Sequence, residues 1–189
     1  ALNDIYTTLC WTVNEISHYG GLNQAVGIMG DSAGGNLAAA ATIYTRDKSE
    51  VRIGCQVLIY PILNIAEFAT ESHRKFARGY FFEAELLHWT AEAYVPGVDD
   101  RRNSLVSPIL EQNLSDLPTA LVQTAQFDVL RDEAESYGQK LALAGNEVRV
   151  VRYQGMVHAF VTMAGKVDLG RIALDDAIGF IQRKFNFTQ

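Results

Sequence analysis

The sequence predicts a single α/β domain whose sheet is mainly parallel and carries helices on both faces. Apolar segments of strand length alternate along the chain with segments of helical periodicity, and the crossovers that such alternation requires make neighbouring strands parallel. The segment "IGCQVLIY" (53–60) is apolar at nearly every position, as strands covered on both faces are. At 189 residues, the chain is long enough for one good hydrophobic core but short for two domains.

The first half of the chain contains two predicted helices and two predicted strands. These are a helix over 2–16, a short buried strand over 24–30, a helix of small side chains over 36–46 and the strand over 53–60. The pair Gly20-Gly21, in the segment "HYGG", is expected to stop the first helix. Pro61 closes the second strand because it cannot donate a hydrogen bond to a strand ladder.

Residues 62–117 interrupt the alternation. This segment is rich in aromatic residues and is too long for an ordinary connection between two strands. We expect one or two helices with an irregular flank, and long excursions of this kind often form a lid or a substrate-binding element.

The alternation resumes after the insertion and continues to the last helix. The predicted elements are a strand over 119–128, a helix over 131–146 with a Gly-Asn end, a strand over 147–153 and a helix over 169–185. The sequence shows neither an internal repeat nor a low-complexity linker.

Composition and charge exclude several classes of protein. The net charge of −6, without a basic cluster, argues against nucleic acid as the main partner. No apolar run has the length of a membrane span, and the first residues lack the pattern of a signal peptide. Cys10 and Cys55 lie among apolar residues without C-x-x-C spacing, so we expect two buried thiols, no disulfide, no metal and, by default, a cytoplasmic protein.

The segment "GDSAG" contains the pattern G-x-S-x-G, with Gly30, Ser32 and Gly34 at its three fixed positions. Read alone, it also fits an ordinary helix cap, since Asp and Ser are common N-cap residues. Its context favours a nucleophile, because Ser32 follows a predicted strand and precedes a predicted helix. At that helix N-terminus, the backbone N–H of Ala33 is expected to face a developing oxyanion.

A nucleophilic serine needs a base, and the base needs an acid that orients it. Asp128 and His158 follow the third and fourth predicted strands, so both are expected at the edge of the sheet where Ser32 lies. Other groups compete for these roles. For the acid they are Asp132, Glu133 and Glu135, which suit the start of a helix, and for the base they are His18, His73 and His88.

Three motifs carry a family resemblance. "GDSAGGN" (30–36), "FDVLRDE" (127–133) and "GMVHAF" (155–160) together resemble the hormone-sensitive-lipase-like esterases, a branch of the α/β-hydrolase superfamily. The similarity extends to "GYFFEAELLHWTAEAY" (79–94), which is similar to the cap segment of that family, and to "LVSPIL" and "LPTALV" near the third strand. The resemblance implies one α/β-hydrolase domain over 1–189 with a partial helical cap at about 64–95.

The resemblance also implies a reaction and its residues. Ser32 would be the nucleophile, Asp128 the acid and His158 the base in the hydrolysis of carboxylic esters of short to medium acyl chain, without cofactor or metal. Tyr80 and Phe81 fall in the cap segment that lines the family's substrate pocket, and Leu130 would border it. A role in the hydrophobic core is an equally good expectation for these three side chains.

One feature of the family is not found in this sequence. Members of the family carry an H-G-G-G-type loop upstream of the nucleophile, and "HYGG" (18–21) is better read as a helix stop. We therefore expect a resemblance to the C-terminal portion of such enzymes only, without their N-terminal strands and with Ala33 as the one evident oxyanion donor. The strand over 24–30 would then be an open edge, which favours association of chains into a homo-oligomer.

The leading expectation is a serine carboxylesterase that acts on a small-molecule ester through an acyl-enzyme. Two alternatives remain open. One is a non-catalytic, ligand-binding α/β-hydrolase homologue, and the other is a different acyl-transfer serine hydrolase, such as a peptidase or thioesterase.

Overall fold

A computed structural model of the chain describes residues 1–21, 25–46, 48 and 50–185. Within these residues the fold is a four-stranded parallel sheet in the order β1-β2-β3-β4. The strands are β1 (Val26–Asp31), β2 (Ile53–Ile59), β3 (Thr119–Phe127) and β4 (Val148–Val157). The predicted α/β fold with a parallel sheet is confirmed.

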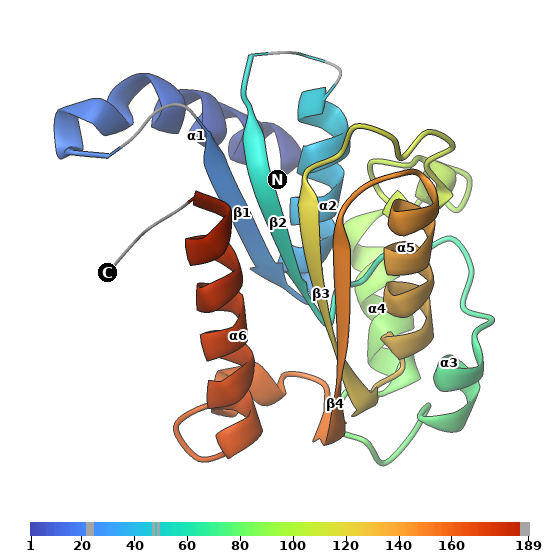
Figure 1. Ribbon diagram of the computed structural model, residues 1–189. Helices are drawn as coiled ribbons and strands as arrows, with labels where there is room; N and C mark the ends of the chain where they lie inside the picture. Colours follow the sequence, from blue (N-terminus) through green and yellow to red (C-terminus); the bar gives the residue numbers. More distant parts are fainter. Residues whose placement is uncertain (22–24, 47, 49, 186–189) are drawn as a thin grey trace.

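Helices cover both faces of the sheet (Figure 1). The α-helices are α1 (Leu2–Glu15), α2 (Ala33–Arg46), α3 (Glu71–Lys75), α4 (Ala84–Tyr94), α5 (Arg131–Leu143) and α6 (Asp168–Phe185). Short 3-10 helices are η1 (Ile16–Tyr19), η2 (Asp100–Arg102), η3 (Pro108–Leu110) and η4 (Phe160–Met163). One core cluster joins α2 and α5 to the sheet and another joins α6 to it, so α6 lies on the opposite face.

Several predicted boundaries agree with the structure. The first helix ends in η1, and Gly20 follows with a φ of +80°, the left-handed conformation that a glycine stop provides. The strand predicted over 24–30 begins at Val26, and its first residue, Gln24, lies outside the described residues. The last strand continues to Val157, four residues beyond its predicted end, and thereby brings the next residue to the edge of the sheet.

The expectation of a buried first strand is wrong. Residues of β1 alternate between half-buried and exposed, and the side chain of Met29 is 52% exposed. The reason is topological: β1 is an edge of the sheet, and Ile28 on one of its faces packs on the cluster that contains α2. The expectation for Cys10 also needs correction, since this thiol is half-buried whereas Cys55 is buried.

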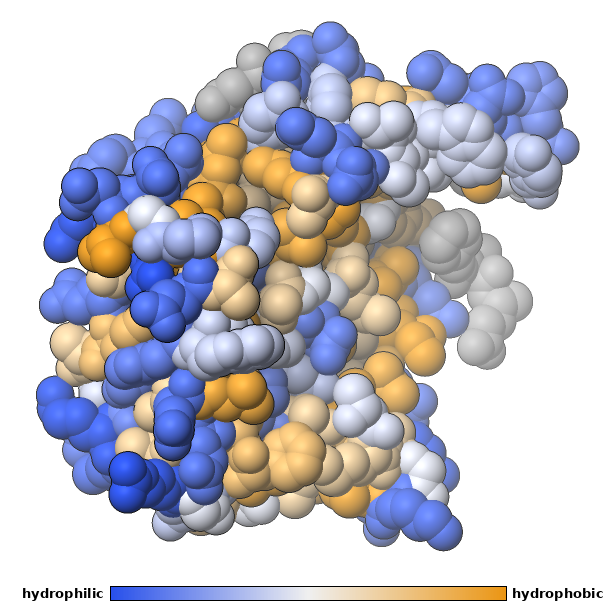
Figure 2. Space-filling view, turned by 180° about the vertical axis from the view of Figure 1, so that it is seen from behind, coloured by the Kyte–Doolittle hydropathy of each residue, from blue (hydrophilic) through white to orange (hydrophobic). Residues whose placement is uncertain are grey.

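Apolar side chains reach the surface across the middle of the face seen in Figure 2, between hydrophilic ones. Large exposed apolar side chains of the molecule include Trp11 of α1, Leu86 and Trp89 of α4 and Ile178 of α6. No helix within the described ranges is both long enough and apolar enough to cross a lipid bilayer.

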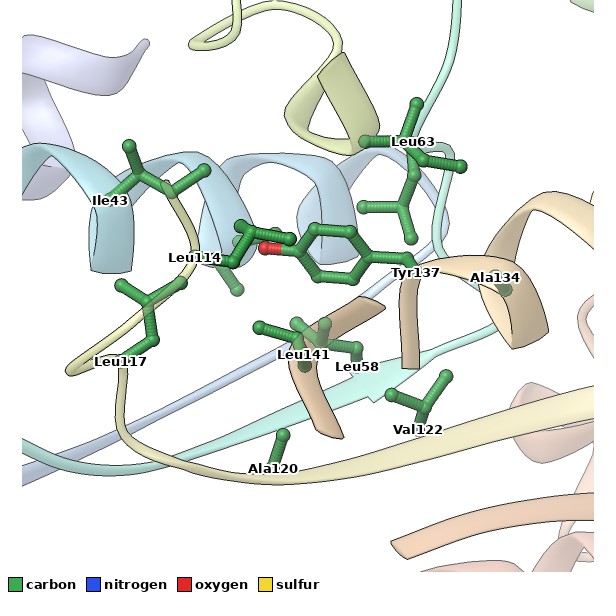
Figure 3. Close-up of a cluster of buried hydrophobic side chains, with 13 residues drawn as sticks. Ile43, Leu58, Leu63, Leu114, Leu117, Ala120, Val122, Ala134, Tyr137 and Leu141 are labelled. Atoms are coloured by element: carbon green, nitrogen blue, oxygen red, sulfur yellow. The ribbon is translucent and has the colours of Figure 1, made fainter. Parts of the chain in front are cut away.

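The larger core cluster has an aromatic side chain at its centre. Figure 3 shows the Tyr137 ring of α5 between leucines of β2, α5 and two loops. Its side chain is completely buried, and burial raises the pKa of the Tyr137 hydroxyl above its ordinary value. This packing fixes α5 on the sheet, and α5 begins three residues after Asp128.

Candidate active site

Ser32 occupies a tight turn between a strand and a helix. β1 ends at Asp31 and α2 begins at Ala33, so Ser32 is the single residue that joins them. Its φ is +52°, a left-handed conformation that is strained for a residue with a side chain. Three backbone hydrogen bonds hold it there: the Ser32 N–H donates to the Ile59 carbonyl at 2.9 Å, and the Ser32 carbonyl accepts from the Asn36 N–H at 3.1 Å and from the Ile62 N–H at 3.2 Å.

Close backbone packing explains two glycines of this turn but not a third. A Cβ on Gly30 would lie 2.2 Å from the Gly34 carbonyl oxygen, and one on Gly35 would lie 2.7 Å from the Cβ of Pro61. A Cβ on Gly34 would meet only the Asp31 carboxylate, at 3.9 Å, which is ordinary contact. The first glycine of G-x-S-x-G is therefore required by space, whereas the second is not.

The structure brings Ser32, His158 and Asp128 into one hydrogen-bonded line. Ser32 Oγ lies 3.0 Å from His158 Nε2, and His158 Nδ1 lies 2.7 Å from Asp128 Oδ2. The other carboxylate oxygen, Oδ1, accepts a 3.0 Å hydrogen bond from the Leu130 N–H. Since Asp128 is 1% and His158 4% exposed, little water competes for these bonds.

Strand ends position the acid and the base. Asp128 directly follows β3 and His158 directly follows β4, and these parallel strands are neighbours in the sheet. Ala159, with a φ of +63°, then turns the chain into η4. The two side chains thus come from the same edge of the sheet as Ser32.

The competing carboxylates are engaged elsewhere. Glu133 accepts hydrogen bonds from the N–H groups of Leu63 and Asn64, and Asp132 accepts one from the Ser72 N–H. Glu135 pairs with Arg152. These carboxylates hold α5 to the insertion and to β4, so each has a structural explanation.

The competing histidines also lie outside this line. His73 and His88 contact each other, with 3.3 Å between their Nε2 atoms, and both stack on Phe68. His18 is exposed beside Glu15. His73 and His88 therefore pack within the insertion.

Two aromatic rings that the sequence did not single out contact the imidazole. The Phe82 ring stacks on His158 with 4.5 Å between centroids and 25° between planes. The Tyr60 ring lies 4.7 Å from it at 57°. The sequence offered only a weak signal for them, the aromatic content of the insertion and an aromatic residue at the end of a strand.

An apolar cavity of about 90 Å³ opens beside the turn. Its lining residues are Ala33, Asn36, Leu37, Ile62, Ile65, Thr90, Ala91 and Tyr94. Ala33 is the first residue of α2, so its N–H is one of the donors that a helix leaves without an intrahelical acceptor. A group bound in this cavity would therefore lie next to both the serine and a free backbone donor.

The three side chains expected at a substrate pocket do not line this cavity. Leu130 is 0% exposed and belongs to the core beneath the insertion, which is the core role given for it as the alternative. Tyr80 stacks on Phe127, and Phe81 is 66% exposed with a φ of +73°. The insertion instead reaches the cavity through α4 and reaches the imidazole through Phe82.

One buried carboxyl near the site has a strongly shifted pKa. Burial raises the pKa of Glu133 to about 8, although hydrogen bonds from Leu63 and Asn64 act in the opposite direction. Among the described residues, no group of three or more His, Cys, Asp or Glu side chains is placed to hold a metal ion.

Comparisons with known proteins agree with this geometry. Residues 1–162 match the family described as alpha/beta hydrolase fold. The chain is 32% identical over 162 residues to an arylesterase of Saccharolobus solfataricus, an alignment covering 85% of this chain and 52% of that protein. It is 35% identical over 170 residues to the carboxylic ester hydrolase LipN of Mycobacterium tuberculosis, covering 86% and 45%. The chain thus spans about half the length of these curated relatives.

Solved structures of similar sequence have the same fold. EstE1, a thermophilic carboxylesterase cloned from a metagenomic library, superposes with a TM-score of 0.91 at 38% identity, covering 97% of this chain and 63% of that one. A hyperthermophilic esterase from Pyrobaculum calidifontis superposes with a TM-score of 0.93 at 36% identity, covering 97% and 60%. These likenesses extend over nearly all of the chain.

Proposed function

Because the chain belongs to the alpha/beta hydrolase fold family, in its hormone-sensitive-lipase-like carboxylesterase branch, we propose that it hydrolyses carboxylic esters with Ser32 as the nucleophile. The observation that carries the proposal is the hydrogen-bonded line from Ser32 through His158 to Asp128, with distances of 3.0 and 2.7 Å. Such a line is the arrangement that activates a hydroxyl for attack on a carbonyl carbon.

Each group in the line has one task in the proposed reaction. Ser32 Oγ attacks the ester carbonyl carbon while His158 Nε2 takes the hydroxyl proton, and Asp128 holds the Nδ1–H and stabilises the imidazolium. The carbonyl oxygen becomes an oxyanion that accepts a hydrogen bond from the Ala33 N–H. When the tetrahedral intermediate collapses, His158 gives the proton to the departing alkoxide, which leaves as the alcohol.

The acyl group then remains on Ser32 as an ester. A water molecule gives a proton to His158 Nε2 and attacks the acyl carbonyl, and collapse of this second intermediate releases the carboxylic acid. The proton returns from His158 to Ser32 Oγ, and the enzyme is restored. These steps consume one ester and one water and yield one alcohol and one acid.

The cavity beside Ala33 supports a preference for short acyl chains. Its lining is almost wholly apolar and its volume is about 90 Å³, so it accommodates a few methylene groups rather than a long chain. In this proposal residues 64–95 act as a cap on a single domain over 1–189, and α4 forms one wall of the pocket. Tyr80 and Phe81 are proposed as parts of the cap rather than of the cavity wall.

Location and assembly form a separate part of the proposal. Two free cysteines are typical of a protein in a reducing compartment, which supports a cytoplasmic location. Within the described residues β1 is an edge strand with exposed side chains, which supports association between copies of the chain. Light scattering coupled to size-exclusion chromatography tests this association, and a single monomeric species would contradict it.

The function is tested with p-nitrophenyl esters of increasing acyl length and with an organophosphate probe. The parent protein is expected to hydrolyse the acetate and butyrate esters and to be labelled at Ser32, whereas Ser32→Ala does neither. Ser17→Ala, which changes an exposed serine of η1, is the matched control and keeps the parent's activity. Absence of Ser32-dependent ester hydrolysis would refute the proposal, and turnover confined to thioesters or peptide anilides would favour the corresponding alternative.

A further inference from the structure

A strained turn in the insertion directs two aromatic rings toward the catalytic edge of the sheet. The Phe82 N–H donates to the Tyr80 carbonyl at 3.0 Å across Phe81, whose φ of +73° is that of a γ-turn. Two more hydrogen bonds brace this turn: the Gly79 N–H donates to Glu83 Oε1 at 2.9 Å, and the Ala84 N–H donates to a carbonyl of the preceding segment. A left-handed residue with a large side chain persists only where its surroundings hold it.

The consequence of the turn is that neighbouring side chains point to different environments. Phe81 is 66% exposed, whereas Tyr80 and Phe82 are both half-buried. The Tyr80 ring stacks on Phe127, with 5.4 Å between centroids and 23° between planes. Phe127 is the last residue of β3 and immediately precedes Asp128.

The second inward ring lies on the base itself. Phe82 stacks on His158 at 4.5 Å and 25°, while the two imidazole nitrogens face Ser32 and Asp128. One turn of the insertion therefore contacts both strand ends that carry the acid and the base. A stacked ring restricts the tilt of the imidazole plane, which is the rotation that would misalign both hydrogen bonds at once.

We propose that Phe82 is a positioning residue that holds the His158 imidazole in the plane required for both of its proton transfers. It acts through His158, and the inference rests on the proposed ester hydrolysis. Because Phe82 belongs to the insertion, docking of the insertion and alignment of the base are coupled through this one contact. Tyr60, which also contacts the imidazole, directly follows β2 and lies outside the insertion.

A spectroscopic test needs no substrate. The chain has four histidines, so its imidazole protons give few NMR signals, and His158→Asn assigns those of His158. Stacking on Phe82 shields the His158 ring protons in the parent. This shielding is expected to disappear in Phe82→Ala and to persist in Phe82→Tyr, which keeps the ring.

A kinetic test uses the same variants. The interaction energy of a stacked aromatic pair changes an equilibrium constant about 2- to 10-fold. Phe82→Ala is therefore expected to lower kcat by that factor, with KM nearly unchanged. Phe82→Tyr is expected to restore kcat. Trp89→Ala, which removes a 63% exposed ring from the same insertion, is the matched control and keeps both the kcat and the His158 signals of the parent.

The outcomes separate this inference from the proposed function. A parent that hydrolyses esters, and whose Phe82→Ala variant keeps the parent's His158 signals, would overturn the positioning role and leave the proposed function in place. A rise in KM at unchanged kcat would also overturn it, because Phe82 would then bind substrate. Melting temperatures show which variants are folded. If Phe82→Ala is not folded, Phe82→Leu, which fills the space without an aromatic ring, is expected to lose the shielding and lower kcat in the same way, and parent-like His158 signals in it would overturn the positioning role.

Discussion

The turns at Ser32 and Phe81 are among those that place a non-glycine residue in a left-handed conformation, with φ of +52° and +73°. They are held in different ways. The Ser32 turn is held by backbone packing, with Gly30 and Gly35 at distances where no side chain fits. The Phe81 turn is held mainly by its neighbours, because Tyr80 and Phe82 stack on rings of other elements.

This difference explains why only the Ser32 turn can be recognised from the sequence. Backbone packing requires particular residues at particular local spacings, so the Ser32 turn is visible as a motif. Aromatic stacking requires a partner that is distant in the chain, so the Phe81 turn looks like any aromatic segment. Substitutions at the site and in the insertion test this difference.

The largest effect is expected from Asp128→Asn. An amide in place of the acid favours the wrong imidazole tautomer in a Ser-His-Asp triad, which costs on the order of 10⁴ in kcat. Ester hydrolysis by purified variants measures the loss. Asp132→Asn changes a nearby carboxylate that bonds to Ser72 instead, and its kcat is expected to stay within a few-fold of the parent. Equal losses in the two variants would contradict the assignment of Asp128 as the acid.

The backbone packing of the Ser32 turn is tested by a pair of glycine substitutions. Gly30→Ala forces a Cβ against the Gly34 carbonyl oxygen and is expected to lower the free energy of unfolding by about 3 kcal/mol or more. Gly34→Ala finds room and replaces a helical glycine, so it is expected to be neutral or stabilising by up to about 1 kcal/mol. Urea unfolding curves measure both. A similar decrease in the free energy of unfolding in both variants would contradict the steric explanation, because a Cβ meets a close contact only at Gly30.

The start of the insertion is tested through Glu133, which accepts hydrogen bonds from Leu63 and Asn64. Its folded-state pKa of about 8 lies above the ordinary 4.5, so the protonated carboxyl is favoured in the folded protein. The stability that this proton contributes is fully present below pH 4.5 and is lost as the pH rises toward about 8. Glu133→Gln keeps an acceptor oxygen without a charge, so the stability of the parent relative to this variant should fall across that range.

Unfolding free energies of both proteins, measured at intervals across that pH range, check the prediction. A difference between parent and Glu133→Gln that does not change with pH would contradict it. At a given pH, Glu133→Gln is expected to change the ester-hydrolysis rate little, because Glu133 bonds to Leu63 and Asn64 and not to Ser32, His158 or Asp128.

The smallest effect is expected at the contact between α3 and α4. Burial, and then the charge of His88, lower the pKa of His73 below its usual 6.5, so the neutral imidazole is favoured in the folded protein. The stability that this preference contributes is present above pH 6.5 and is lost as the pH falls through the lower, folded-state pKa. Melting temperatures should therefore decline less on acidification in His73→Gln than in the parent. An equal decline in the two proteins would contradict this account.

Much of the fold was predictable because its signals are local. The alternation of apolar strands and amphipathic helices indicated a parallel sheet, and the glycine pair at 20–21 indicated the end of the first helix. What the sequence left open or misjudged depends on the tertiary environment. Met29 is exposed because β1 is an edge strand, and Leu130 takes the core role among its alternatives because the insertion folds over it.

The residues of the candidate site also fall into a predictable group and an unpredictable one. Ser32, Asp128 and His158 could be selected in advance, since each follows a predicted strand and parallel strands end at a common edge. The assignment of Phe81 rather than Phe82 to the pocket could not be avoided, because two adjacent phenylalanines carry the same signal. Only the γ-turn decides which ring faces the imidazole.

By itself, the sequence determined the class of fold and the three groups that the proposed chemistry needs, because strand periodicity, glycine spacing and order along the chain are local properties. Tertiary structure decided which aromatic ring contacts His158 and where an apolar cavity opens beside Ala33. It also decided that Glu133 accepts a hydrogen bond from the Leu63 N–H and takes no part in the site. These depend on how segments far apart in the chain cross, and that is set by packing of the whole core rather than by any short stretch.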